Sequence, residues 1–245
     1  MAFLIRALAV GLLGASLTTW VPKDFNCPDC STKNTFRVIA SYGSYIYQWP
    51  SKFQYIFWPL TDPNVVYSCS QCRLTCFMWD YEKFPREKME EVRKKLQGIE
   101  IEEKADYAKI PMSQRLAAAE RVYEVLGKDD DFWCRFRRVQ GYHLEAEGKA
   151  EEAKAARKKA LELGLKLLDR KENAGKRKEL LLVTGSMRYF TGETDAALKD
   201  LEEALKLKFE ADDPKKSENM DRYFSEVLRQ FIDALKEGRR PGEEK

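Results

Sequence analysis

Residues 141–160, GYHLEAEGKAEEAKAARKKA, determine the fold of this 245-residue chain, because a related stretch, GSMRYFTGETDAALKDLEEA, occupies residues 185–204. Small residues recur between the two stretches at a displacement of 44 residues. The pairs are Gly141 and Gly185, Gly148 and Gly192, Ala153 and Ala197, and Ala160 and Ala204. Small residues let paired helices pack closely, and a glycine at the turn closes a helical hairpin. The pattern therefore predicts a mainly α fold with two related helical hairpins.

The order of these small residues resembles that of a tetratricopeptide repeat, with a period longer than the usual length of about 34 residues. A long second helix, from Lys149 to about Asp169, accommodates the difference. The large residue that such a repeat carries between its two alanines is Arg157 in the first unit and Leu201 in the second. We expect tetratricopeptide-like helical repeats over residues 85–211.

Further helices are predicted on both sides of the repeat. Pro85 suits the first turn of one helix, and Ser113 can cap another that Gly127 ends. After Pro214 an apolar stripe at helical spacing predicts a helix over residues 212–236 that covers the open end of the hairpins. A helix that binds a partner is the alternative. Residues 237–245 are typical of a disordered tail.

Two Cys-x-x-Cys pairs precede the helices, Cys27-Pro-Asp-Cys30 and Cys69-Ser-Gln-Cys72. Four thiolates that arrive as two tight pairs suit one tetrahedral Zn²⁺ ion, in a closed site that leaves no position for a substrate. We therefore expect a structural zinc ion, whose ligands are Cys27, Cys30, Cys69 and Cys72. A thiol-redox pair formed by Cys27 and Cys30 is the alternative, although no helix pattern follows Cys30 to lower a thiol pKa.

The segment around these pairs is rich in aromatic residues. Residues 20–84 carry 16 of the 29 aromatic residues, whereas most charged residues lie after Phe84. Alternation from Phe36 to Tyr42 predicts a strand, and residues 45–49, 53–58 and 65–68 are shorter candidates. We expect a β-rich zinc-binding module over residues 20–84, in which large side chains enlarge a small core. A carbohydrate-binding aromatic platform over residues 42–58 is the alternative.

The first 19 residues are typical of a secretory signal peptide. Arg6 precedes an apolar run over residues 7–17, with small residues near its end. The run is shorter than the roughly 20 residues that span a bilayer. We expect an exported protein, periplasmic or secreted, with no stable membrane span after cleavage; a cytoplasmic protein or an uncleaved anchor are the alternatives. Export favours disulfides over zinc, but the tight pairing of the cysteines favours the metal.

Together these motifs resemble the bacterial "domain of unknown function 2225" family. The similarity rests on Cys27-Pro-Asp-Cys30, on the run Asp62-Pro-Asn-Val-Val-Tyr-Ser-Cys69-Ser-Gln-Cys72, and on the helices that follow, and it extends from about Phe25 to about Lys208. The second pair departs from the family pattern Cys-Pro-x-Cys-Gly-Tyr-Ala, because Ser70 and Arg73 stand in place of proline and glycine. The resemblance implies a metal-bound N-terminal module and repeat helices, and it implies no established activity.

Composition and motifs narrow the classes of function. The net charge is +3, from 43 basic and 40 acidic residues, which is too balanced to favour nucleic acid or anionic lipid. His143 is the only histidine, and its spacing after Phe136 and Val139 predicts a residue at the edge of the core. The chain has no phosphate-binding glycine loop and no nucleophile elbow. Cys76 and Cys134 are expected to be buried apolar thiols, although Cys76 is close enough to Cys72 in sequence to replace it as a ligand.

Stacked helical hairpins form extended grooves that bind peptides. We therefore expect a non-catalytic protein-protein interaction scaffold, in which the concave surface of the repeats holds a protein or peptide ligand.

Overall fold

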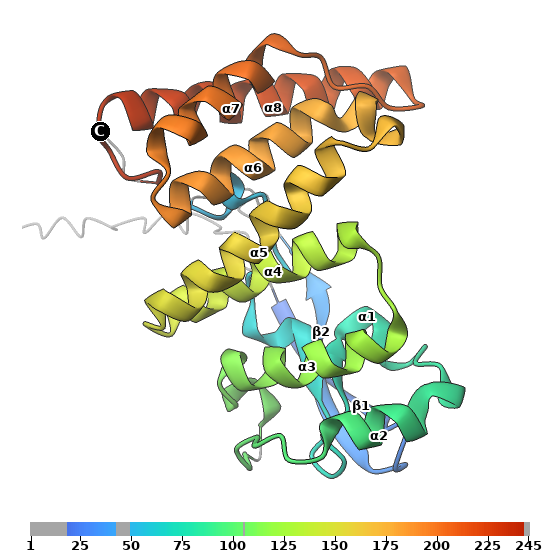
Figure 1. The fold of residues 1–245 in the computed structure, drawn as a ribbon. Helices are drawn as coiled ribbons and strands as arrows, with labels where there is room; N and C mark the ends of the chain where they lie inside the picture. The colour runs from blue at the N-terminus through green and yellow to red at the C-terminus, as the bar shows by residue number, and fades with distance from the viewer. Residues whose placement is uncertain (1–18, 43–49, 105, 243–245) are drawn as a thin grey trace, which may run out of the picture.

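The structure is a computed structural model that describes residues 19–42, 50–104 and 106–242. Within these residues the fold is mainly α, as the repeat predicted, with a small β part near the N-terminus (Figure 1). Residues 1–18 of the expected signal peptide, the strand expected at 45–49 and the last three residues of the tail lie outside the described residues.

In the described residues, the strands come first along the chain and the α-helices follow them. The helices are α1 (Met78–Tyr81), α2 (Met89–Leu96), α3 (Met112–Leu126), α4 (Asp130–Ala146), α5 (Ala150–Leu168), α6 (Arg177–Thr191), α7 (Thr194–Lys206) and α8 (Pro214–Lys236). The strands form two antiparallel hairpins, β1 (Thr19–Asn26) with β2 (Lys33–Ser41), and β3 (Val66–Ser68) with β4 (Thr75–Phe77).

The strand predictions have mixed outcomes. The strand predicted from alternation is confirmed by β2, in which Phe36 is buried and Arg37 is exposed. The strand expected at residues 53–58 is wrong. The chain instead forms a short 3₁₀ helix, η2 (Ser51–Gln54), and Tyr55 then adopts a left-handed φ of 53°, which a strand does not contain.

Helix α3 begins differently from the prediction. Ser113 lies inside α3, which begins at Met112, and its hydroxyl makes no hydrogen bond. The backbone N–H groups at the start of the helix find their acceptor in the Glu147 carboxylate instead. It accepts hydrogen bonds from the N–H groups of Met112 (2.5 Å) and Ser113 (3.3 Å). Gly127 ends the helix at a φ of 60°, as predicted.

The two halves of the sequence repeat form helical hairpins with the same internal contacts. Hairpin α4–α5 turns at Gly148 and hairpin α6–α7 at Gly192, both with positive φ. A Cβ atom on Gly141 would lie 2.8 Å from Arg157 Cγ, and one on Gly185 would lie 2.8 Å from Leu201 Cγ. Glycine is therefore required in both first helices, because each second helix inserts a large side chain at the equivalent place.

The largest hydrophobic cluster crosses the boundary expected at Phe84. It joins Phe25 and Phe36 of the first β hairpin to buried residues of α2, α3 and the first half of α4, as far as Val139. Helix α3 packs directly on β3 and β4. The β hairpins therefore share one core with the helices that follow them.

A short segment of the N-terminal half reaches into the C-terminal helices. Helix α8 packs its apolar stripe against α6 and α7, and η2 lies beside α6 and α8 (Figure 1). Phe53 of η2 is fully buried, with its ring 4.8 Å from that of Phe231 on α8, and Lys52 Nζ donates to Gln230 Oε1 at 2.8 Å. We call residues 51–55 the inserted segment. It anchors the N-terminal half to the last helix.

Candidate metal centre

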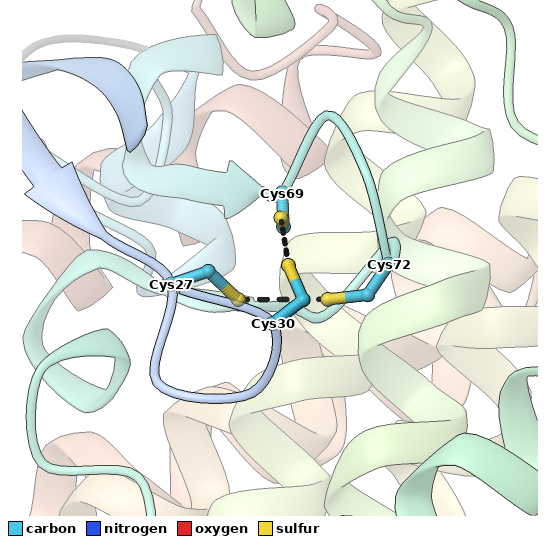
Figure 2. Close-up of side chains that lie close together, drawn as sticks. All are labelled: Cys27, Cys30, Cys69 and Cys72. Carbon is cyan, nitrogen blue, oxygen red and sulfur yellow. Dashed lines mark hydrogen bonds between the residues drawn. The ribbon is translucent and has the colours of Figure 1, made fainter. Parts of the chain in front are cut away.

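Each Cys-x-x-Cys pair forms the turn of one β hairpin. Cys27 and Cys30 lie between β1 and β2, and Cys69 and Cys72 lie between β3 and β4. The structure brings these four residues together from segments about 40 residues apart in sequence (Figure 2). Every member of the ligand set predicted from sequence therefore lies in one cluster.

The two turns have the same backbone geometry. In the first, Cys27 N donates to Thr32 O (2.9 Å) and Ser31 N donates to Cys27 O (3.0 Å). In the second, the equivalent bonds from Cys69 N to Leu74 O and from Arg73 N to Cys69 O measure 3.0 and 3.2 Å. The residue after each second cysteine, Ser31 or Arg73, has a positive φ, of 61° and 63°. A left-handed residue at this place lets both thiols of a pair face the same point.

The sulfur atoms have the spacing of a tetrahedral metal site. All four Sγ atoms lie within 4.8 Å of one another, with 3.5 Å between Cys27 and Cys72 and 3.6 Å between Cys30 and Cys69. Zinc–sulfur bonds of about 2.3 Å in tetrahedral geometry separate neighbouring sulfurs by about 3.8 Å. A disulfide would need a sulfur–sulfur distance of about 2.05 Å. The four residues therefore fit a metal ion in both number and spacing.

The thiols of Cys27 and Cys69 compete for a proton. The contact with Cys69 raises the pKa of Cys27 to about 11, and the same contact lowers the pKa of Cys69 well below its usual range. A bound divalent cation favours the thiolate form of every ligand. The arrangement is thus suited to a cation that neutralises several sulfur charges at once.

Two polar residues that the sequence patterns do not reveal support the cluster. Asn34 on β2 is buried; its Nδ2 donates to Cys69 Sγ (3.5 Å), and its Oδ1 accepts from Ser70 N (2.8 Å). The side chain therefore ties one hairpin to the turn of the other. Asp29, in the first turn, accepts a hydrogen bond from Arg93 Nε of α2 at 2.7 Å. Such outer contacts orient the ligands of a metal site.

The other two cysteines lie outside the cluster. Cys76 on β4 is fully buried, and Cys134 on α4 is buried with its thiol directed at Ala160 O, 3.5 Å away. Burial raises the pKa of both thiols. Both are therefore protonated, unreactive residues of the core.

His143 is a buried structural residue. Its Nε2 lies 2.8 Å from Leu60 O, which fixes this nitrogen as the donor. Burial is the main cause that lowers the pKa of His143 to about 4. The nearby Arg115 adds to this effect, while the hydrogen bond to Leu60 O and the carboxylates of Glu147 and Asp62 partly oppose it. The imidazole is therefore neutral at pH 7 and holds the chain at Leu60.

The residues of the expected aromatic platform separate into different environments. Phe53 is buried between helices, whereas the ring of Trp58 lies 5.5 Å from that of Trp20 and 5.3 Å from that of Tyr42. Tyr55, Phe57 and Trp58 line a cavity of about 830 Å³ that α4 and α6 complete. Residues 43–49 of the platform lie outside the described residues.

None of the helices in the described residues combines the length and the apolar character that crossing a bilayer requires.

Comparisons with protein-family models, with curated proteins and with solved structures found no match to this chain.

Proposed function

We propose that this protein is a non-catalytic binding scaffold stabilised by a structural zinc ion. The single observation that carries the proposal is the four-cysteine cluster, which two turns of identical geometry close. Zinc bound there would cross-link the two β hairpins and supply free energy of folding. All four positions of a tetrahedral ion would be filled by protein thiolates, so no position remains for catalysis.

The arrangement of the sulfur atoms disfavours the thiol-redox alternative. A redox pair needs the two thiols of one Cys-x-x-Cys motif to face each other, with a lowered pKa. Here Cys27 approaches Cys72 of the other hairpin, and Cys30 approaches Cys69. A strand, β2, follows the first pair, so no helix N-terminus stabilises a thiolate there.

The helical half supports the binding role. We propose that hairpins α4–α5 and α6–α7 are tetratricopeptide-like units, because their glycine contacts repeat at the same spacing. Their helices already hold a peptide segment, which is the inserted segment. Arg138 Nη1 donates to Tyr55 O (2.7 Å) and Gln54 O (3.3 Å), and Arg157 Nη2 donates to Gln54 Oε1 (2.9 Å). These contacts have the chemistry of peptide recognition, an apolar anchor with hydrogen bonds to main-chain carbonyls.

The inserted segment also limits where a partner binds. Because it fills the space beside α6 and α8, a protein ligand is expected on the surface that the segment leaves open.

Native mass spectrometry of the full chain tests the zinc scaffold. We expect one zinc ion per wild-type chain and none in a variant with Cys27, Cys30, Cys69 and Cys72 all replaced by Ser. A Cys76→Ser variant is the matched control, and it should keep its zinc. A metal-free chain with a Cys27–Cys30 disulfide and turnover in a disulfide-reduction assay would replace the scaffold by the redox function.

A further inference from the structure

A cavity lies where the two halves of the molecule meet. Its walls are Tyr55, residues 57–60, Trp79 of α1, the turn before α4 with the first half of α4, and Glu179 of α6. Its volume of about 830 Å³ lies within the range of roughly 300 to 1,000 Å³ that is typical of small-molecule sites. The cavity is separate from the four-cysteine cluster, and none of its lining residues has a role in holding the metal.

Aromatic rings supply much of the cavity wall. They are Tyr55, Phe57, Trp58, Trp79 and Phe132. Trp79 is 44% exposed, and its ring stacks on that of Phe77, with ring centroids 4.9 Å apart and planes at 25°. A braced and accessible indole of this kind can stack on a flat apolar face of a ligand.

Polar groups in the same wall call for a ligand with hydroxyl groups. Arg135 is exposed, and Glu179 is half-buried with the Tyr55 hydroxyl as its partner. Burial raises the pKa of Glu179. A purely apolar ligand would leave such groups without partners.

The charges of the lining cancel. The lining includes three basic side chains, Lys128, Arg135 and Arg138, and three acidic ones, Asp129, Asp131 and Glu179. A site for an anion or a cation would carry an excess of the opposite sign. The balance therefore favours a neutral ligand.

We infer that this cavity binds a neutral carbohydrate. A sugar ring presents an apolar C–H face, which an aromatic ring covers, and a rim of hydroxyls, which act as both donors and acceptors. Trp79 would stack on the ring, and Arg135 and Glu179 would bind hydroxyls. This site goes beyond the proposed scaffold function and does not depend on a protein partner. It depends on the metal in one respect, since Trp79 follows β4 of the second cysteine hairpin by two residues.

The test is a titration of the full zinc-bound chain with neutral oligosaccharides, the tetramers of β-linked glucose, of α-linked glucose and of N-acetylglucosamine. Calorimetry gives the affinity, and tryptophan fluorescence reports on the site. We expect at least one of these sugars to bind, and Trp79→Ala and Arg135→Ala each to weaken binding by about tenfold or more. Arg135 is exposed, so its variant keeps the fold and gives a second, independent test of the site.

Trp133→Phe is the matched control, because Trp133 lies on α4 but lines a different surface, beside Arg137 and Leu163. It should bind sugar as the wild type does. Absence of binding to all three sugars would overturn the inference, and so would binding that neither Trp79→Ala nor Arg135→Ala weakens. Zinc content measured on the same sample separates the two proposals: a zinc-loaded chain that ignores every sugar refutes only the carbohydrate site.

Discussion

Replacing Phe53 by alanine tests whether the inserted segment holds the C-terminal helices together. Phe53 belongs to the N-terminal half of the sequence, yet its side chain has no exposed surface and packs in the cluster that α6, α7 and α8 form. Phe53→Ala removes the ring and leaves a cavity beside Phe231. The remaining contacts of the segment, from Arg138 to the carbonyls of Gln54 and Tyr55, involve the main chain and survive the change.

The expected loss of stability follows from this burial. Truncation of a fully buried phenylalanine to alanine destabilises a protein by about 3–5 kcal/mol, through lost transfer free energy and the residual cavity. The edge-to-face contact with Phe231, at 4.8 Å and 62°, is of a kind that contributes about 0.5–1.5 kcal/mol beyond burial. We expect Phe53→Ala to lower the free energy of unfolding by about 4 kcal/mol.

Urea unfolding followed by circular dichroism measures the loss, and hydrogen exchange locates it. We expect faster exchange in α6 and α8, with β1, β2 and the zinc content unchanged. Trp79→Ala is the control, because the 44% exposed Trp79 should change stability by less than about 1 kcal/mol. A Phe53→Ala loss as small as that of the control, or exchange that increases mainly around the cysteines, would refute the anchoring role.

Three further predictions concern other parts of the fold. Gly185→Ala should destabilise the protein by about 1–2 kcal/mol in thermal unfolding, because overpacking against Leu201, 2.8 Å from the new Cβ, outweighs the gain in helix propensity; an unchanged midpoint would show that the hairpin is loosely packed. The folded pKa of His143, about 4, lies below the ordinary 6.5, so the unfolded state binds more protons and stability should fall by about 3 kcal/mol from pH 6.5 to pH 4. His143→Gln, which can still donate to Leu60 O, should weaken the pH dependence of the free energy of unfolding, measured by urea titrations at several pH values. An unchanged pH dependence in this variant would show that other titratable groups cause it. Removing zinc with a chelator should increase exchange in both β hairpins and in α3, which shares their core, while α6 to α8 stay protected; uniform loss of protection would argue against separate stability of the two halves.

Periodic and paired residues could be interpreted from sequence because their signals are local. The recurrence of small residues such as Gly141 and Gly148 at a displacement of 44 residues predicted the helical hairpins, and the four cysteines that the Cys-x-x-Cys spacing selected do lie together. The alternation around Phe36 predicted β2. In each case the physical constraint acts between residues a few positions apart, or between motifs that can each be recognised in the sequence by their own spacing.

The features that the sequence did not predict depend on distant contacts. Nothing near Phe53 shows that its ring packs against α8, so an aromatic run was interpreted as a strand. The turn at Tyr55, with its left-handed φ, is fixed by Arg138 of α4, 83 residues away. Asn34 supports the cysteines only because the two hairpins meet, and no spacing rule marks it. Strand β1 is not predicted from the sequence because it includes Pro22, a residue that lacks the N–H group of a strand ladder. An edge strand of a hairpin can still contain proline.

The position of the inserted segment determines the order in which the parts of this protein can fold during its synthesis. The sulfur contact between Cys27 and Cys72 spans 45 residues, whereas the contact between Lys52 and Gln230 spans 178. At roughly 5 to 20 residues per second, a ribosome takes about 10 to 35 s to travel that longer distance. The cysteine hairpins can therefore assemble while Phe53 still lacks the helix that covers it. A nascent chain released before α8 would leave the Phe53 ring uncovered, and transiently exposed apolar surface of this kind promotes aggregation.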